Sequence, residues 1–457
     1  MTSEKRENWG SSLGFIMAAA GSAIGLGSLW RFPYLCATHG GALFVLCYIL
    51  FTFLVSLPIF IAELIIGRKA GKGPVDALTA LSHRHGPWRQ LSWLCVITNL
   101  IILSFYSVIS GWSLHYLVLS MQDFTQGRTP EEIANLFDLF YASSDLNIFW
   151  LATFMAMSAC VVLGGIKKGI EMWATLLTPG LFVLMLALLG YCTTLSGFPK
   201  AISFLFLPDW SHFTSAAILE ALGMAFFTLS VGLGILITYG SYMKKSQSIP
   251  ATAIAVAGMN VAVSLIASLI IFPLIFTFDM PVDSGPGLVF KVLPVLFSKL
   301  PATKLLSTLF FLILLLTAIT SSISILETLA TTGMEAFGWS RKKAVIVWSV
   351  SGFFLALPSA LSGSKALLPN WDTIYRNDFL SQINALPDWM LSVGALSFAL
   401  FVTRYMPKKQ IEDEFKKSSP KGAYFFGIWF FAAKFIAPVA IITILLHKLE
   451  VLELFQG

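Results

Sequence analysis

The stretch GSAIGLGS, residues 21–28, decides how this chain must fold, because it places three glycines inside a long apolar run at 12–36. Roughly 20 mostly apolar residues are enough for a helix to cross a bilayer. Glycine lets the chain leave helical geometry and lets a ligand approach the backbone closely. Unwound backbone is costly in lipid unless it lines a cavity inside the protein. The stretch therefore predicts a membrane helix that is interrupted near its middle, where free N–H groups suit a carboxylate and free carbonyls suit a cation.

The composition places the rest of the chain in a bilayer as well. Of 457 residues, 56% are hydrophobic and only 12% are charged, which is more apolar surface than one soluble core needs. The sequence predicts an all-α membrane protein forming a single transmembrane domain over 1–457. Its eleven predicted transmembrane helices lie near 12–36, 42–67, 91–120, 147–164, 172–193, 216–243, 250–278, 303–336, 343–361, 384–404 and 423–447.

Lysine and arginine predict the orientation, since cytoplasmic loops hold the excess of both. With the N-terminus inside, the inner connections collect most of the bases, among them Lys5, Arg6, Arg68, Lys167, Lys168, Lys244, Lys245, Arg341, Lys342 and Lys343. This predicts a multi-pass protein of the cell inner membrane with a cytoplasmic N-terminus and the segment 448–457 outside. The net charge of +6 then needs no nucleic-acid partner. Lys434, inside the last span, is expected to snorkel toward the membrane surface.

Several other classes of site find little support. The five cysteines lie in or beside apolar runs, and the six histidines show no metal-ligand spacing. Glu63 and Glu327 have no evident acid or base partner, which argues against an enzyme. A membrane channel stays open as an alternative, although it would need a continuous polar pathway.

Two short strings indicate an internal repeat. AIGLG at 23–27 and SVGLG at 230–234 each lie in the first span of a five-span group. Because five is odd, the second group would enter the membrane from the opposite side. The interpretation is a 5+5 inverted repeat, about 10–193 and 216–404, with broken helices 1 and 6 and one extra helix at 423–447. Packing of helices through small residues is the alternative reading of both strings.

Longer strings resemble the neurotransmitter:sodium symporter family. They are NWGSSLGFIMAAAGSAIGLGSLWRFPY (8–34), FFTLSVGLGILITYGSY (226–242) and TAITSSISILE (317–327). The resemblance covers most of the chain and is weakest in spans 9–11. It implies a sodium-coupled symporter of neutral, apolar L-amino acids that works by alternating access. The alternative is a transporter of amino acids or small osmolytes with a single sodium site and no chloride dependence.

Carried over position by position, the family's substrate pocket implies contacts from spans 1, 3, 6 and 8. The residues are Ser22, Ala23, Leu26, Gly27, Ile102, Tyr106, Phe227, Thr228, Ser230, Leu233, Ser321 and Ile325. The resemblance has the Tyr106 hydroxyl bond the substrate carboxylate. Amine transporters of the family place an aspartate where Gly25 lies, so Gly25 argues against monoamines.

The resemblance also implies one or two Na⁺ ions, held by oxygen ligands as a hard cation requires. One site would use Gly21, Ile24, Thr317, Thr320 and Ser321, although hydroxyls in membrane helices often only bond the preceding turn. A second would use Ala23, Ser28, Thr228 and Asn260, with Ser28 in place of the family's asparagine. Chloride-independent members carry an acid where Ser264 lies. A Cl⁻ ion held by Tyr48, Thr228 and Ser264 is therefore expected, against the alternative that the second sodium site is empty and needs no anion.

Gate residues are implied on both sides of the pocket. On the outer side Arg31 should pair with an acid of span 10. The aligned position is Ser381, so Asp378 is the nearest substitute. On the inner side the family's gate matches Arg6, Trp9, Ser241, Tyr242 and Glu335. Lipid and an amino-acid substrate are the expected partners, and the sequence leaves the oligomeric state open.

Overall fold

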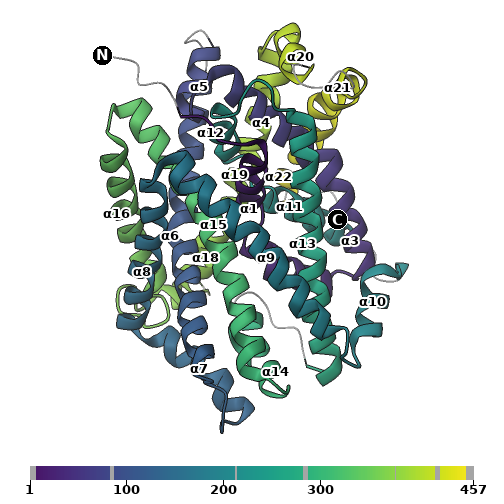
Figure 1. The fold of residues 1–457 in the computed structure, drawn as a ribbon, viewed down its shortest axis with the longest axis vertical. Helices are drawn as coiled ribbons and strands as arrows, with labels where there is room; N and C mark the ends of the chain where they lie inside the picture. Colours follow the sequence, from purple (N-terminus) through teal and green to yellow (C-terminus); the bar gives the residue numbers. More distant parts are fainter. Residues whose placement is uncertain are drawn as a thin grey trace.

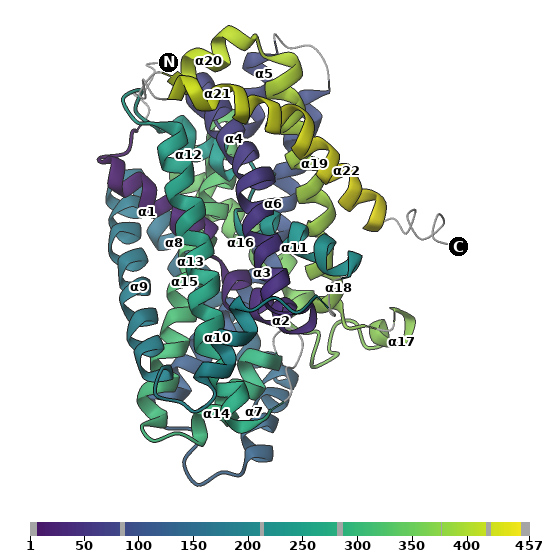
Figure 2. The same cartoon turned by 90° about the vertical axis from the view of Figure 1, so that its right-hand side faces the viewer.

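The computed structural model describes residues 7–82, 87–210, 214–280, 287–375, 377–416 and 422–448, and within these ranges the chain is helical without any strand. Figures 1 and 2 show an elongated bundle whose long helices run along the long axis. In the described part of the chain, nine helical spans are long and apolar enough to cross a membrane, and ten if one bent pair is a single span. The predicted all-α membrane protein is confirmed.

The elements of the first half follow the predicted spans closely. They are α1 (Ser12–Ala23), η1 (Gly27–Arg31), α2 (Phe32–Thr38), α3 (Ala42–Phe51), η2 (Thr52–Ser56), α4 (Leu57–Ala70), α5 (Pro74–Leu81), α6 (Trp88–Met121), α7 (Pro130–Ala142), α8 (Ser144–Leu163), η3 (Ile166–Glu171), α9 (Met172–Cys192) and α10 (Phe198–Phe206). The η elements are short π-helical turns that continue the neighbouring α-helices.

The second half contains the remaining spans and their connections. Its elements are α11 (Ser215–Thr228), α12 (Ile235–Ser241), α13 (Ile249–Phe278), η5 (Leu288–Val292), α14 (Leu293–Ser298), α15 (Thr303–Phe337), α16 (Arg341–Ala360), α17 (Trp371–Tyr375), α18 (Phe379–Ala385), α19 (Pro387–Leu400), η6 (Phe401–Tyr405), α20 (Lys408–Lys416), α21 (Gly422–Phe431), η7 (Ala432–Ile436) and α22 (Ala437–Lys448).

The first span is interrupted where the glycines predicted it. α1 ends at Ala23, the backbone of Ile24 is extended, and the chain resumes as Gly27–Thr38 at an angle of 55° to α1. A Cβ on Gly27 would lie 2.4 Å from the ring of Phe227, so only glycine permits this approach to span 6.

The sixth span is interrupted in the same way. Between α11 and α12, positive φ angles occur at Ser230 (52°), Gly232 (90°) and Gly234 (71°). A Cβ on Gly232 would lie 2.2 Å from the carbonyl oxygen of Leu391. The two pieces, of 14 and 7 residues, are each shorter than a full span; together they correspond to the sixth predicted span, 216–243.

The two interrupted spans run in opposite directions. In Figure 2, α1 lies above α2, whereas α11, the earlier piece of the sixth span, lies below α12. α6 and α15 pack along each other at the centre, with 78% and 83% of their apolar windows buried, against 33% for α8 and for the span formed by η3 and α9. The breaks therefore meet in the most enclosed part of the protein. The exact limits of the two repeats stay a prediction.

Candidate functional site

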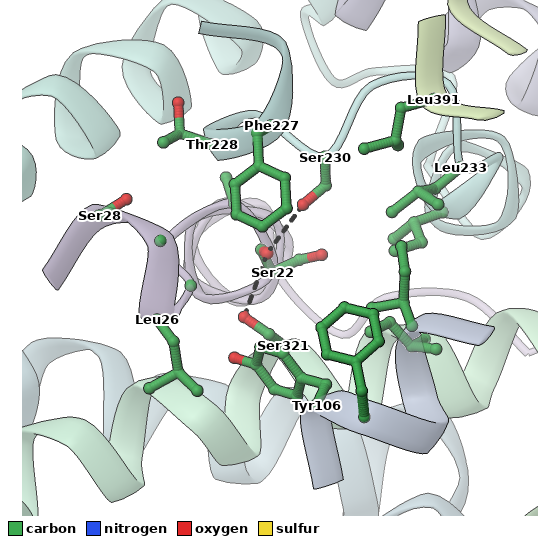
Figure 3. Close-up of a pocket in the computed structure, with 17 residues that line it drawn as sticks. Ser22, Leu26, Ser28, Tyr106, Phe227, Thr228, Ser230, Leu233, Ser321 and Leu391 are labelled. Carbon is green, nitrogen blue, oxygen red and sulfur yellow. Dashed lines mark hydrogen bonds between the residues drawn. The ribbon is translucent and has the colours of Figure 1, made fainter. Parts of the chain in front are cut away.

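A hollow opens where the two breaks face α6 and α15 (Figure 3). The space between its lining atoms, including the part open to solvent, is about 540 Å³. The twelve residues predicted to contact substrate all line it: Ser22, Ala23, Leu26, Gly27, Ile102, Tyr106, Phe227, Thr228, Ser230, Leu233, Ser321 and Ile325. Gly25, Ser28, Phe105, Ile235 and Leu391 complete the lining.

One part of the hollow is polar. The hydroxyls of Ser22 and Tyr106 are buried and have no hydrogen-bond partner among the described residues. Ser230 donates a hydrogen bond to the carbonyl of Ser22 over 3.3 Å, which ties the two breaks together (Figure 3). A Cβ added to Gly25 would lie 3.4 Å from Ser321 Oγ and 3.9 Å from the Tyr106 hydroxyl. The glycine therefore keeps open the space beside these hydroxyls, where an anionic group can be bound.

The opposite part of the hollow is apolar. Its walls are the side chains of Ile102, Phe105, Phe227, Leu233, Ile325 and Leu391. The sequence analysis did not name Phe105 or Leu391. Phe105 precedes Tyr106 on α6, and Leu391 lies on α19, in the region where the family strings are weakest. Apolar walls select side chains only by size and shape, by about 1–3 kcal/mol per methylene group.

The first predicted sodium site is assembled around Ser321. Its Oγ lies 3.4 Å from the carbonyl oxygen of Gly21 and 3.3 Å from that of Ile24. The carbonyl of Ser22 is also 3.4 Å away and was not predicted. Carbonyls released by the break thus converge on one hydroxyl, an arrangement of oxygens that suits a hard cation.

Thr317 and Thr320 bond the preceding turn of α15. Thr317 donates to the carbonyl of Ile313 over 2.8 Å, and Thr320 donates to that of Thr317 over 3.0 Å. Both hydroxyl protons are therefore used within α15, as the alternative of bonding to the preceding turn predicts. A hydroxyl that donates in this way keeps its lone pairs, so the oxygen of Thr320 can still be a ligand.

The second sodium site and the chloride site share one hydrogen-bond network. Asn260 accepts from Ser28 Oγ over 3.3 Å and donates to the Tyr48 hydroxyl over 3.0 Å. The Tyr48 hydroxyl lies 3.1 Å from Thr228 Oγ1 and 3.2 Å from Ser264 Oγ. All five side chains are buried. The structure brings these predicted residues together without any carboxylate among them.

The outer gate prediction is wrong for Asp378. Arg31 forms an ion pair with Asp388 instead, with 2.8 Å between NH2 and Oδ2 and 3.2 Å between NH1 and Oδ1. The Arg31 guanidinium also lies 5.0 Å from the centroid of the Phe227 ring, so the pair contacts a residue that lines the hollow.

Asp378 has a different role at the start of α18. It accepts a hydrogen bond from the Ser381 backbone N–H over 3.1 Å, and another from the Tyr141 hydroxyl. Burial, followed by the bond to Asp378, raises the pKa of Tyr141. The predicted substitute therefore caps a helix and fastens α7, and does not face Arg31.

The residues predicted to form the inner gate gather around Trp9 and Tyr242. Trp9 is completely buried, donates from Nε1 to the carbonyl of Tyr239 over 3.0 Å, and stacks edge-on against that ring. Tyr242 donates to Glu327 over 3.0 Å. Glu327 also forms a buried ion pair with Arg341, which the sequence analysis did not connect with it.

The other inner-gate residues are placed as follows. Glu335 accepts from the Gly73 backbone N–H over 2.8 Å, and Ser241 donates to the Thr238 carbonyl. Arg6 lies outside the described residues. Glu63, which had no evident partner in the sequence, accepts from the Gly232 backbone N–H over 2.6 Å and so supports the second break.

The chain is similar to known proteins in both sequence and fold. The model of the sodium:neurotransmitter symporter family matches residues 6–130 and 133–455. An uncharacterised sodium-dependent transporter of Bacillus subtilis is 35% identical over 99% of this chain and 100% of its own length. Another, from Haemophilus influenzae, is 32% identical over 98% of this chain and 99% of its own. The crystal structure of MhsT in complex with L-phenylalanine matches 97% of this chain and 99% of that one, with a TM-score of 0.89 and 37% identity.

Proposed function

Since the chain belongs to the sodium:neurotransmitter symporter family, and is therefore a sodium-dependent transporter and not an enzyme, we propose that it carries a neutral, apolar L-amino acid together with Na⁺ by alternating access. The observation that carries the proposal is the hollow between the breaks, with two unpartnered buried hydroxyls at its polar part and apolar walls elsewhere. A buried hydroxyl without a partner is costly, and a bound substrate carboxylate would relieve that cost.

The amino-acid class follows from the two ends of the hollow. The Tyr106 hydroxyl would bond the carboxylate, and backbone carbonyls of the break in span 6 would accept from the ammonium group. The crystal structure of the neighbour MhsT holds L-phenylalanine, and the walls formed by Phe105, Ile325 and Leu391 suit a side chain of that apolar kind. Gly25 leaves no acid for an amine that lacks a carboxylate.

The oxygen groups would hold one or two Na⁺ ions. One would be held by Gly21, Ile24, Thr317, Thr320 and Ser321. The other would be held by Ala23, Ser28, Thr228 and Asn260 together with the substrate carboxylate. Arg31 with Asp388 would form the outer gate, and Arg6, Trp9, Ser241, Tyr242 and Glu335 the inner gate. The protein would sit in the cell inner membrane with its N-terminus in the cytoplasm and its C-terminus outside.

The test is radiolabelled phenylalanine uptake into proteoliposomes with an inward sodium gradient. We expect saturable accumulation above the equilibrium level, abolished when potassium replaces sodium. Equal accumulation with either cation would refute sodium coupling. Flux that never saturates would favour a channel.

Chloride is proposed as a stimulating ion. The network of Tyr48, Thr228 and Ser264 contains no carboxylate, so a cation bound nearby would lack compensation in a low-dielectric interior. We expect sodium-driven uptake to fall when gluconate replaces chloride on both sides, and Ser264→Glu to restore it. Ser264→Gln is the control, because glutamine has nearly the same shape as glutamate but no charge. Wild-type uptake indifferent to chloride would favour a single-sodium mechanism instead.

A further inference from the structure

Spans 10 and 11 each contain a π-helical turn, and the two turns touch. η6 (Phe401–Tyr405) closes with a bond from the Met406 N–H to the Phe401 carbonyl, and η7 (Ala432–Ile436) with one from Ala437 to Ala432. Such turns carry a cost in hydrogen-bond geometry and are frequent at functional sites. Each turn here presents one cation, Arg404 on η6 and Lys434 on η7.

Three cations gather around two phenyl rings at this junction. The Lys434 ammonium lies 5.8 Å from the centroid of the Phe430 ring and 5.4 Å from that of Phe435. Lys408 approaches the Phe430 ring at 5.5 Å, and the Arg404 guanidinium approaches the Phe435 ring at 6.0 Å. Each ring therefore faces two positive charges, which repel one another.

Carboxylates do not balance this cluster within the described part of the chain. Arg404, Lys408 and Lys434 form no ion pair there, whereas the nearby acids have other partners: Glu412 pairs with Lys416, and Glu414 with the buried Arg68. Asp413, on α20, is exposed. Attraction to the ring faces compensates a cation by about 0.5–2 kcal/mol only. The cluster thus carries positive charge that the described carboxylates leave unbalanced.

The surroundings point to an anion that arrives from the bilayer. Trp429 faces inward and donates to the carbonyl of Pro58 on α4. The other face of the span exposes large apolar side chains at a helical spacing: Ile428, Phe431, Phe435, Val439 and Ile442. Val439 is 65% exposed, which only lipid would cover. Figures 1 and 2 place α21 beside α20 near the end of the molecule that also carries α5, the end predicted to face the cytoplasm.

We propose that Arg404, Lys408 and Lys434 bind the phosphate of an anionic phospholipid of the cytoplasmic leaflet, with its acyl chains along Phe435 and Val439. The leaflet is anionic, and each basic residue near its surface contributes to binding. The headgroup would hold together η6 and η7. Because η6 ends the same span whose other end carries Asp388, the site would also brace the span of the outer gate.

The experiment measures lipid binding to the purified protein in neutral detergent by native mass spectrometry. Phosphatidylglycerol is titrated against phosphatidylcholine with the same acyl chains. Wild type should bind phosphatidylglycerol more tightly, and Arg404→Gln with Lys434→Gln should weaken that binding about 30-fold, since two cations are lost. Arg404→Lys with Lys434→Arg keeps the charges and should bind as wild type does. Lys245→Gln with Lys342→Gln removes two exposed cations elsewhere and should change little.

Three results would overturn the proposal. The first is equal phosphatidylglycerol binding by wild type and the double glutamine variant. The second is equal weakening by the remote control pair, which would indicate a diffuse charge effect. The third is displacement of the lipid by millimolar inorganic phosphate, which would indicate a site for a soluble anion. If the double variant does not fold, Lys434→Gln alone, with an expected loss of about fivefold, gives the same decision. None of these readouts depends on transport.

Discussion

At the scale of single residues, Ser321 shows how one hydroxyl can be distinguished from its neighbours. Three hydroxyl residues follow one another on α15, yet of the three only Ser321 forms hydrogen bonds with the carbonyls of the first break. Thr320 bonds its own helix, and Ser322 donates to Ser158 over 2.9 Å on another face. The helical step of about 100° between successive residues explains the difference.

The first prediction follows from that difference. Ser321→Ala removes an oxygen next to the predicted cation, so the sodium concentration needed for half-maximal phenylalanine binding should rise tenfold or more, because a bond to a charged group contributes about 1.5–3 kcal/mol. Ser322→Ala is the matched control and should leave the sodium dependence unchanged. Binding of radiolabelled phenylalanine to purified protein at varied sodium gives both values. Equal effects of the two variants would count against the assignment.

The outer ion pair gives a second prediction. Asp388→Asn removes the charge opposite Arg31 and should reduce the uptake rate at least tenfold while phenylalanine binding persists, because the pair is the proposed outer gate and does not line the hollow. Asp378→Asn should keep near wild-type uptake, because that carboxylate binds Tyr141 and the first turn of α18. Initial uptake rates and equilibrium binding separate the two effects. If Asp378→Asn reduced uptake more than Asp388→Asn, the sequence-based assignment of Asp378 as the partner of Arg31 would be favoured again.

The sequence contained a signal for Asp388 that the alignment concealed. Within the predicted span 384–404 it is the only acid, and an acid inside a membrane span is functional by default. The family strings instead aligned Arg31's partner with Ser381, in a connection whose length no motif fixes. Motifs placed the polar and apolar contacts on spans 1, 3, 6 and 8, whereas Leu391 and Asp388 required three-dimensional packing of span 10.

At the scale of elements, the N-terminal segment and the start of the fifth span are joined by reciprocal hydrogen bonds, in which a carboxylate of each accepts from backbone N–H groups of the other. Glu171 in η3 accepts from the Gly10 N–H over 2.6 Å and from the Ser11 N–H over 2.9 Å. In return Glu7 accepts from the Ile166 N–H over 2.7 Å. A Cβ on Gly14 would lie 2.1 Å from Glu171 Oε1, so the glycine makes room for this contact. Two segments about 160 positions apart thus hold each other near Trp9.

Glu171→Gln tests how much the hydrogen bonds of Glu171 stabilise the N-terminal segment. A neutral amide is a weaker acceptor than a carboxylate, so the backbone amides of residues 10–14 should exchange hydrogen about tenfold faster or more. Hydrogen exchange followed by mass spectrometry measures the change. Glu131→Gln, at an exposed position in the first turn of α7, should leave the same peptide unaffected. Unchanged exchange in Glu171→Gln would mean that other contacts alone hold the segment.

At the scale of the whole molecule, ligands should stabilise the fold, because the hollow gathers parts of spans 1, 3, 6, 8 and 10. Ligand at 100 times its dissociation constant adds about 2.7 kcal/mol to the free energy of unfolding. Phenylalanine with sodium should therefore raise the melting temperature of the purified protein, and phenylalanine with potassium should not. Intrinsic tryptophan fluorescence during heating provides the measurement. A similar rise in melting temperature with sodium and with potassium would mean that substrate binding does not require sodium.

The global architecture was largely predictable from the sequence for a physical reason. A bilayer demands long apolar helices and restricts unwound backbone to internal cavities, so hydropathy and glycine spacing alone located the spans and both breaks. The lengths of α20 and α21, the ion pair of Arg68 with Glu414 and the pairing of Glu327 with Arg341 were not predictable. These features depend on how segments distant in the sequence pack against the bundle, and neither periodicity nor composition predicts such packing.

The two sides of the hollow differ in how many contacts must break to open them. On the side of Arg31, proposed as the outer side, the structure shows one ion pair and one phenyl ring. On the side of Trp9, proposed to face the cytoplasm, it shows Trp9, Tyr242, the Glu327–Arg341 pair and the hydrogen bonds of Glu171. Release toward the cytoplasm should then have the larger activation enthalpy. Cooling would slow delivery more than capture, so a chilled membrane would accumulate loaded carriers rather than empty ones.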